Sequence, residues 1–181
     1  MGKLQLSFSR AMHHWQGDIF APVELVQYGD FQSNDCAAVF DDVKLLLETL
    51  GSRICFVYLH FPLHKIHPLA LDAAIAAEAA AAQGKFWEMH DHIYQNQADI
   101  QRSALWVYAK TIGLDMVKFA GDIKQKRLFY RVINDFESGK RSGVDSPPAF
   151  FINGHRYNGP INFEGLYRSC KNQYNMHSLA V

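Results

Sequence analysis

A short strand that turns directly into a helix constrains the fold of this chain more than any other stretch. Val23 to Tyr28 is rich in apolar and β-branched residues, as buried central strands are. From Ser33 onward, apolar residues recur at helical spacing as far as Leu50, and Gly51 stands where a C-terminal cap would. The pattern predicts a strand, a turn and a helix that starts near Ser33, with Cys36 one turn inside it.

Further strands are expected before and after a long central stretch. Arg53–Leu59 is apolar enough for a second buried strand, and Ala149–Ile152 for a third. Asn153-Gly154 is a strong signal for a hairpin that pairs this third strand with residues His155–Tyr157. We expect the segment Met12–Ala21 before the first strand to be an approach loop.

The stretch between the second and third strands has helical spacing throughout and predicts four or five helices. The first of them is the Ala-rich segment Ala70–Ala82, which Gly84 would close. A terminal helix capped by Asn162 follows the hairpin. We therefore predict one α/β domain over residues 1–181 with an inserted helical subdomain over residues 64–140.

Charge and cysteine usage exclude several classes of protein. Lys plus Arg and Asp plus Glu both count 18, so the chain lacks the basic excess of nucleic-acid-binding proteins. We expect no membrane partner, because no run of about 18 apolar residues occurs. Met1–Gly17 has no signal-peptide pattern. Cys36, Cys55 and Cys170 lie far apart, which fits a reducing compartment. These features predict a cytoplasmic protein.

Short motifs spread along residues 12–167 form a recognisable set. They are Ala21-Pro22-Val23, Gly29-Asp30-Phe31, His60-Phe61-Pro62-Leu63, His67-Pro68, Gly84 to Asp91, Ser142-Gly143-Val144 and Pro148 to Gly154. Together they resemble the bacterial DsbA-like thiol-disulfide oxidoreductases, which are also found fused to sodium/proton antiporters. The resemblance implies a thioredoxin-like fold with an inserted α-helical subdomain, and disulfide exchange or isomerase-like chemistry.

The chain departs from that family where the chemistry takes place. The family motif is Cys-x-x-Cys with the first cysteine as nucleophile, whereas this chain has Ser33-Asn34-Asp35-Cys36. A serine hydroxyl forms no accessible anion near neutral pH, so we expect dithiol exchange to be lost or weak. Cys36 matches the second, resolving cysteine, and the negative charge of Asp35 would raise the pKa of its thiol.

A second departure concerns Pro147-Pro148. In the resemblance, Pro148 matches a cis-proline that faces the motif, and the residue before it pairs its backbone with the substrate. That residue is Pro147 here, which has no N–H. The site would keep the carbonyl oxygen of this residue as an acceptor and lose the N–H as a donor. The resemblance implies a substrate site formed by Asn34, Asp35, Pro147 and Pro148.

Three functions remain open from the sequence. The first is a redox-silent module that binds a peptide or small thiol in the cleft between Ser33 and Pro148. The second is a glutathione-dependent transferase or isomerase similar to the kappa class, with Ser33 stabilising the glutathione thiolate. The third is residual exchange through Cys36. We predict no cofactor, apart from glutathione under the second function, and the aromatic residues of the insert leave a homodimer open.

The histidines do not form a recognised ligand set, and we predict no metal site. Adjacent His13 and His14 cannot converge on an ion without further donors. The remaining histidines near motifs have no fourth donor at ligand spacing. They are His60, His64, His67, His90 and His92.

Overall fold

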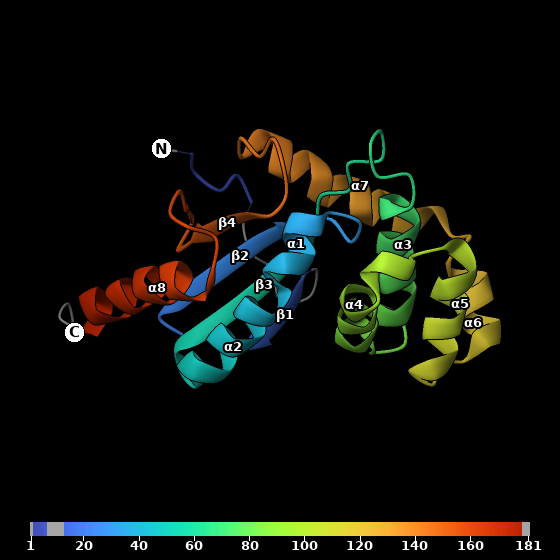
Figure 1. The fold of residues 1–181 in the computed structure, drawn as a ribbon, viewed down its shortest axis with the longest axis horizontal. Coiled ribbons are helices and arrows are strands. Elements are labelled where there is room, and N and C mark those ends of the chain that lie inside the picture. The colour runs from blue at the N-terminus through green and yellow to red at the C-terminus, as the bar shows by residue number, and fades with distance from the viewer. Residues whose placement is uncertain (1, 7–12, 179–181) are drawn as a thin grey trace.

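A five-stranded sheet of order β1-β3-β2-β4-β5 organises the part of the chain that the computed structural model describes, residues 2–6 and 13–178. β2 and β3 are parallel, and the other pairs are antiparallel. The strands are β1 (His14–Gly17), β2 (Val23–Gly29), β3 (Ile54–His60), β4 (Ala149–Ile152) and β5 (His155–Arg156). Figure 1 shows the long strands β2 and β3 side by side at the centre of the sheet.

The central strands are apolar on both sides because helices cover both faces of the sheet. All seven residues of β3 are buried. Leu25 and Phe56 are paired in register and belong to one apolar cluster, while the next pair, Val26 and Val57, belongs to the cluster on the opposite face. The alternation of side chains along each strand therefore fills two cores.

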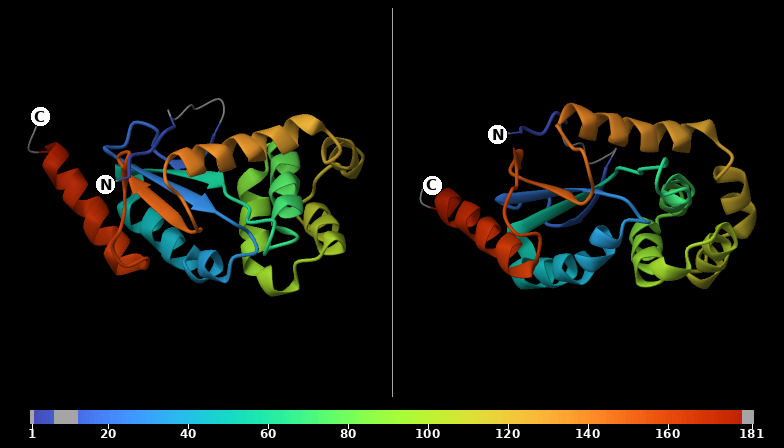
Figure 2. Two further views of the ribbon diagram at one scale, coloured as in Figure 1. Left: turned by 90° about the horizontal axis from the view of Figure 1, so that it is seen from above. Right: turned by 45° about the horizontal axis from the view of Figure 1, so that its top comes forward.

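Helices α1, α2 and α8 cover one face of the sheet, α7 crosses the other, and α3 to α6 group beyond one end (Figure 1 and Figure 2). Helices α3 to α7 lie between β3 and β4 in the chain. The fold predicted from the sequence, thioredoxin-like with an inserted helical subdomain, is confirmed. The helices are α1 (Asn34–Ala38), α2 (Phe40–Leu50), α3 (Ala70–Ala81), α4 (Phe86–Gln95), α5 (Arg102–Thr111), α6 (Met116–Asp122), α7 (Lys126–Arg141) and α8 (Phe163–Ser178).

Two expectations about the elements are wrong. Residues 14–17 form the strand β1, which pairs antiparallel with β3, where we expected an approach loop. The helix expected to run on to Leu50 is divided at Val39, whose backbone angles are φ −97° and ψ −3°. Apolar spacing continues across this break, because Cys36, Phe40 and Val43 all face the same core.

The end of the chain follows the prediction closely. Asn153 and Gly154 have φ of 46° and 77°, the left-handed conformation that a tight hairpin requires, and they join β4 to β5. Asn162 Oδ1 accepts a hydrogen bond from Gly165 N at 2.9 Å, which confirms the expected cap. The limits 64–140 set for the insertion stay a prediction. Within the described residues, no helix has both the length and the apolar character needed to cross a membrane.

Candidate functional site

Ser33 connects the start of α1 to the loop before β4. It is the N-cap of α1, with φ −73° and ψ 120°, and its Oγ accepts a hydrogen bond from Cys36 N at 3.3 Å. The same hydroxyl donates to the carbonyl oxygen of Pro147 at 3.5 Å. Only 5% of Ser33 is exposed. The hydroxyl is thus engaged in contacts within the protein on both sides.

Cys36 is inaccessible and held in its neutral form. Its exposed fraction is 0%, and its Sγ accepts a hydrogen bond from Asp30 N at 3.5 Å. Burial raises the pKa of the thiol to about 12, and the negative charge of Asp30 adds to this against the hydrogen bonds from Asp30 and Ser33. The carboxylate whose charge raises the pKa of the thiol is Asp30, whereas we expected this effect from Asp35. At neutral pH Cys36 offers no thiolate.

Asp30 ties the motif to the loop that follows β3. Its carboxylate is buried and accepts hydrogen bonds from Gln32 N at 2.7 Å, Leu63 N at 2.8 Å and His67 Nδ1 at 2.7 Å. In the sequence, Asp30 is recognised only as part of the motif Gly29-Asp30-Phe31. Two of its partners are 33 and 37 residues away, and helical or strand periodicity does not reveal contacts at that range.

A pocket of about 330 Å³ opens between α1 and the loop before β4. The Pro147–Pro148 peptide bond in this loop is cis. Of the predicted substrate residues, Asp35, Pro147 and Pro148 line the pocket together, whereas Asn34 is exposed and does not line it. The lining residues are Asp35, Ala38, Val39, Ser146, Pro147, Pro148 and Ile161.

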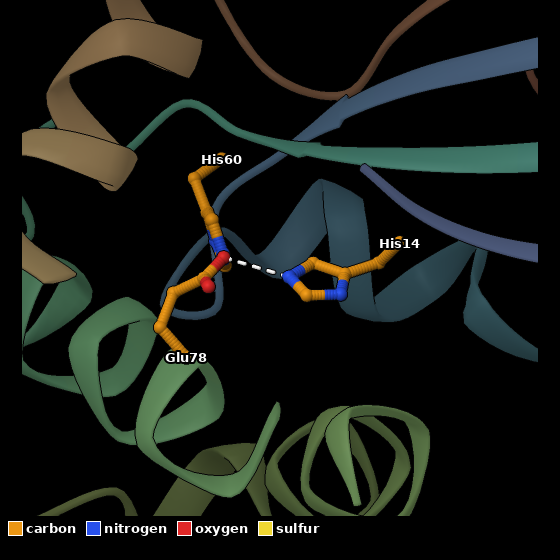
Figure 3. Close-up of side chains that lie close together, drawn as sticks. All are labelled: His14, His60 and Glu78. Atoms are coloured by element: carbon orange, nitrogen blue, oxygen red, sulfur yellow. Dashed lines mark hydrogen bonds and ion pairs between the residues drawn. The ribbon is translucent and has the colours of Figure 1, made fainter. Parts of the chain in front are cut away.

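A separate buried cluster joins β1, β3 and α3, and sequence reasoning missed it (Figure 3). Glu78 Oε1 lies 2.8 Å from His14 Nε2 and 3.0 Å from His60 Nε2. Burial raises the pKa of Glu78, but the hydrogen bonds from both histidines outweigh it and hold the pKa well below its usual range. Burial lowers the pKa of His14. In the sequence, the available signal of this cluster is a lone glutamate in an alanine-rich helix.

This cluster fits a carboxylate that is hydrogen-bonded by two imidazoles better than a metal site. Its three donor atoms lie within 4.8 Å of one another, which is close enough to be considered for a cation. A metal on Nε2 of His60 would leave the ring proton on Nδ1, which is buried and has no partner among the described residues. Arg131 Nε also lies 3.8 Å from Glu78 Oε1 and would repel a dication.

The other histidines considered as ligands are spread over different surroundings. His67 is hydrogen-bonded to Asp30, and His90 Nδ1 lies 2.9 Å from Asp91 Oδ1. His64 is exposed on the loop after β3. His92 contacts the ring of Tyr108 instead.

Comparison with known proteins gives a consistent picture. A family model described as Thioredoxin matches residues 9–172. The Na(+)/H(+) antiporter NhaA 1 of Mycobacterium sp. (strain KMS) is 37% identical over 160 residues, which are 87% of this chain and 26% of that protein. NhaA 3 of Salinispora tropica is 39% identical over 153 residues, 84% of this chain and 23% of that protein. The chain thus spans about a quarter of the length of these curated relatives.

Solved structures with the same fold include a thiol-disulfide exchange protein and the oxidised form of a second protein. The thiol-disulfide exchange protein α-DsbA2 from Wolbachia pipientis superposes with a TM-score of 0.80 at 19% identity, covering 90% of this chain and 88% of that one. BdbD from Bacillus subtilis, in its oxidised form, gives 0.79 at 16% identity, covering 96% and 97%. At this identity the likeness concerns the fold.

Proposed function

We propose that this chain, which belongs to the thioredoxin family and has the fold of its DsbA-like members, has little or no dithiol oxidoreductase activity. In its place, the cleft beside Pro148 binds a peptide or a small thiol. The observation that carries the proposal is the state of Cys36. It is the only thiol of the motif, and it is fully buried.

Thiol-disulfide exchange needs a thiolate that can reach the sulfur of a substrate. Position 33 supplies a hydroxyl, whose pKa lies far above neutrality, and that hydroxyl already bonds Cys36 N and Pro147 O. Cys36, with a pKa of about 12 and no exposed surface, cannot take over the attacking role. The first step of exchange, in which a thiolate attacks the substrate and forms a mixed disulfide, therefore has no nucleophile.

The cleft keeps features that suit a bound chain. Pro147 lacks an N–H, so an incoming backbone can bond this residue only at its carbonyl oxygen, which already accepts from Ser33. Backbone pairing is then weaker than in a two-bond ladder. Apolar contact with the half-exposed Ile161, which lines the pocket, supports binding instead.

The proposal is tested first by measuring thiol reactivity. We expect the native protein to react slowly with an aromatic disulfide reagent at pH 7.5, because all three cysteines are buried, and to react fully in guanidinium chloride. Insulin reduction should stay at the level of a blank, and oxidised glutathione should add no mass to the intact protein. Rapid labelling that Cys36→Ser abolishes would contradict the proposal and favour exchange through Cys36.

A glutathione-dependent activity gives a different result in the same protein. Ser33 would have to release Pro147 O and turn its hydroxyl toward the ligand thiolate. Reduced glutathione would then raise the melting temperature of the wild type and leave Ser33→Ala unchanged. If S-methylglutathione, which has no thiol, stabilises both proteins equally, the cleft binds the peptide part and the redox-silent function stands.

A further inference from the structure

A second pocket, of about 430 Å³, shares no lining residue with the cleft beside Pro148. Its walls are largely apolar and come from the loop after β3 and from α7. Ile66 in this loop is 68% exposed and adds apolar surface to the wall of the pocket. The lining residues are Pro62, Leu63, His64, Lys65, Ile66, Phe136 and Lys140.

The rim of this pocket carries positive charge without a compensating carboxylate. Lys65 and Lys140 line it and are exposed, and neither forms an ion pair among the described residues. Glu137 lies on the same helix as Lys140 but does not line the pocket. An apolar hollow with two free ammonium groups suits a ligand that carries an apolar group beside carboxylates.

The pocket and the cleft lie at the same edge of the sheet. β2 and β3 are parallel and β4 is antiparallel to β2, so the end of β3 and the start of β4 both flank the end of β2. Neighbouring strands are about 4.8 Å apart, which places the two loops about 10 Å from each other, or about three residues of extended chain. The pocket is lined from α7 and the cleft from α1, on opposite faces of the sheet, so a segment that fills both must cross this edge between the two loops.

We propose that the ligand of this site is an acidic peptide segment, which places a large apolar side chain with flanking carboxylates in the lysine-rimmed pocket and runs across the motif into the cleft beside Pro148. The inference rests on the proposed function and names its ligand class. Asp35 lines the cleft, so carboxylates of the peptide are favoured at the lysine end and disfavoured at the cleft end. Asp30, which bonds both Leu63 N and His67, holds the loop of the pocket against the motif.

The test uses fluorescence anisotropy with labelled nonapeptides that contain Glu-Phe-Glu or Lys-Phe-Lys followed by Ser-Gly-Val. We expect the acidic probe to bind at least tenfold more tightly than the basic one at low salt, with the difference shrinking as salt screens the charges. The double variant Lys65→Glu/Lys140→Glu should weaken the acidic probe at least tenfold. The matched variant Lys124→Glu/Lys126→Glu, on exposed lysines of the insert outside both pockets, should bind as the wild type does.

Other results would overturn the inference. Equal binding of both probes, or an unchanged affinity in the Lys65/Lys140 variant, removes the lysine-rimmed pocket from recognition. Binding of dodecanoate with no binding of the acidic probe assigns the pocket to an amphiphile instead of a peptide. The variant Ala38→Arg, which fills the cleft, separates the two proposals. If Ala38→Arg alone weakens binding of the acidic probe, only the cleft binds the peptide. If only Lys65→Glu/Lys140→Glu weakens it, the proposal that the cleft binds the peptide fails.

Discussion

At Ser33, one hydroxyl group caps helix α1 and also donates to the carbonyl of Pro147. An N-cap side chain of this kind contributes about 1 kcal/mol to stability. The residue therefore has a structural use that is independent of any catalysis. Replacing it with cysteine exchanges a good cap for a poor one while it returns a nucleophile to the motif.

The variant Ser33→Cys should regain only weak insulin reduction, because Pro147 still has no N–H to pair with a substrate backbone. The double variant Ser33→Cys/Pro147→Thr should be several-fold faster, since threonine restores that donor. Insulin turbidity measured at equal protein concentrations distinguishes them. Equal rates in the two variants would mean that Pro147 does not limit exchange.

Individual residues were predictable from the sequence where their role is local. Ser33 and Asn162 both precede a helix, and a serine or asparagine at that place is read as a cap from its immediate neighbours. Glu78 was not predictable in this way. It occupies a buried position on α3 only because His14 and His60, from two strands, converge on it.

At the scale of elements, α7 approaches the sheet closely at Gly139. A Cβ atom at Gly139 would lie 2.6 Å from Phe61 Cδ2 and 3.0 Å from Tyr28 Cδ1. Both rings are fully buried and have no room to move. The glycine allows the helix to lie directly against these aromatic residues.

Gly139→Ala should destabilise the protein by about 2 kcal/mol, because overpacking outweighs the better helix propensity of alanine. Gly121 in α6 offers a matched control, since nothing lies within 4 Å of a Cβ there. Gly121→Ala should be neutral or stabilising by up to about 1 kcal/mol. Urea denaturation of both variants measures the difference, and an undiminished midpoint for Gly139→Ala would contradict the packing argument.

Long elements with strong periodicity were predicted well, and their interruptions were not. The strands β2 and β3 are buried on both faces, which leaves a clear apolar signal. β1 is only four residues long and half-buried, so its sequence resembles a loop and its pairing with β3 is a tertiary effect. The break at Val39 leaves the apolar stripe unchanged, and spacing alone cannot show it.

For the whole molecule, buried histidines link stability to pH. Burial lowers the pKa of His14 and of His90 below the usual value of 6.5, so the unfolded chain takes up these protons first as the pH falls. Their contribution to stability is complete above pH 6.5 and is lost below it. The lowered pKa of Glu78 causes a further loss of stability in more acidic solution. The raised pKa of Asp135 partly offsets this loss.

We therefore expect the free energy of unfolding to decrease as the pH falls from 7.5 to 5.5. Denaturant titrations at three pH values in that range provide the measurement. His14→Gln should show a shallower dependence, whereas His155→Gln, at an exposed position, should keep the slope of the wild type. A stability that rises toward pH 5.5 would show that these histidines are protonated in the folded state.

The overall architecture was predicted from two sources of different strength. Spacing gave the succession of strands and helices, including five helices between β3 and β4 in the described chain. The arrangement of these elements in one sheet followed from the resemblance to a family, because periodicity carries no information about strand order. The second pocket and the histidine cluster depend on that arrangement, and neither was foreseen.

The order of the strands has a consequence for how this protein behaves at high concentration. Its two outermost strands, β1 and β5, are four and two residues long, while the seven-residue apolar strands β2 and β3 lie between neighbours. Lys3 also bridges to His155 on the outer side of β5. Long unpaired strands are the templates on which chains add to one another and aggregate. Among the described residues, the sheet has no long strand with an unpaired edge. Its long apolar strands β2 and β3 are paired on both sides in the native state.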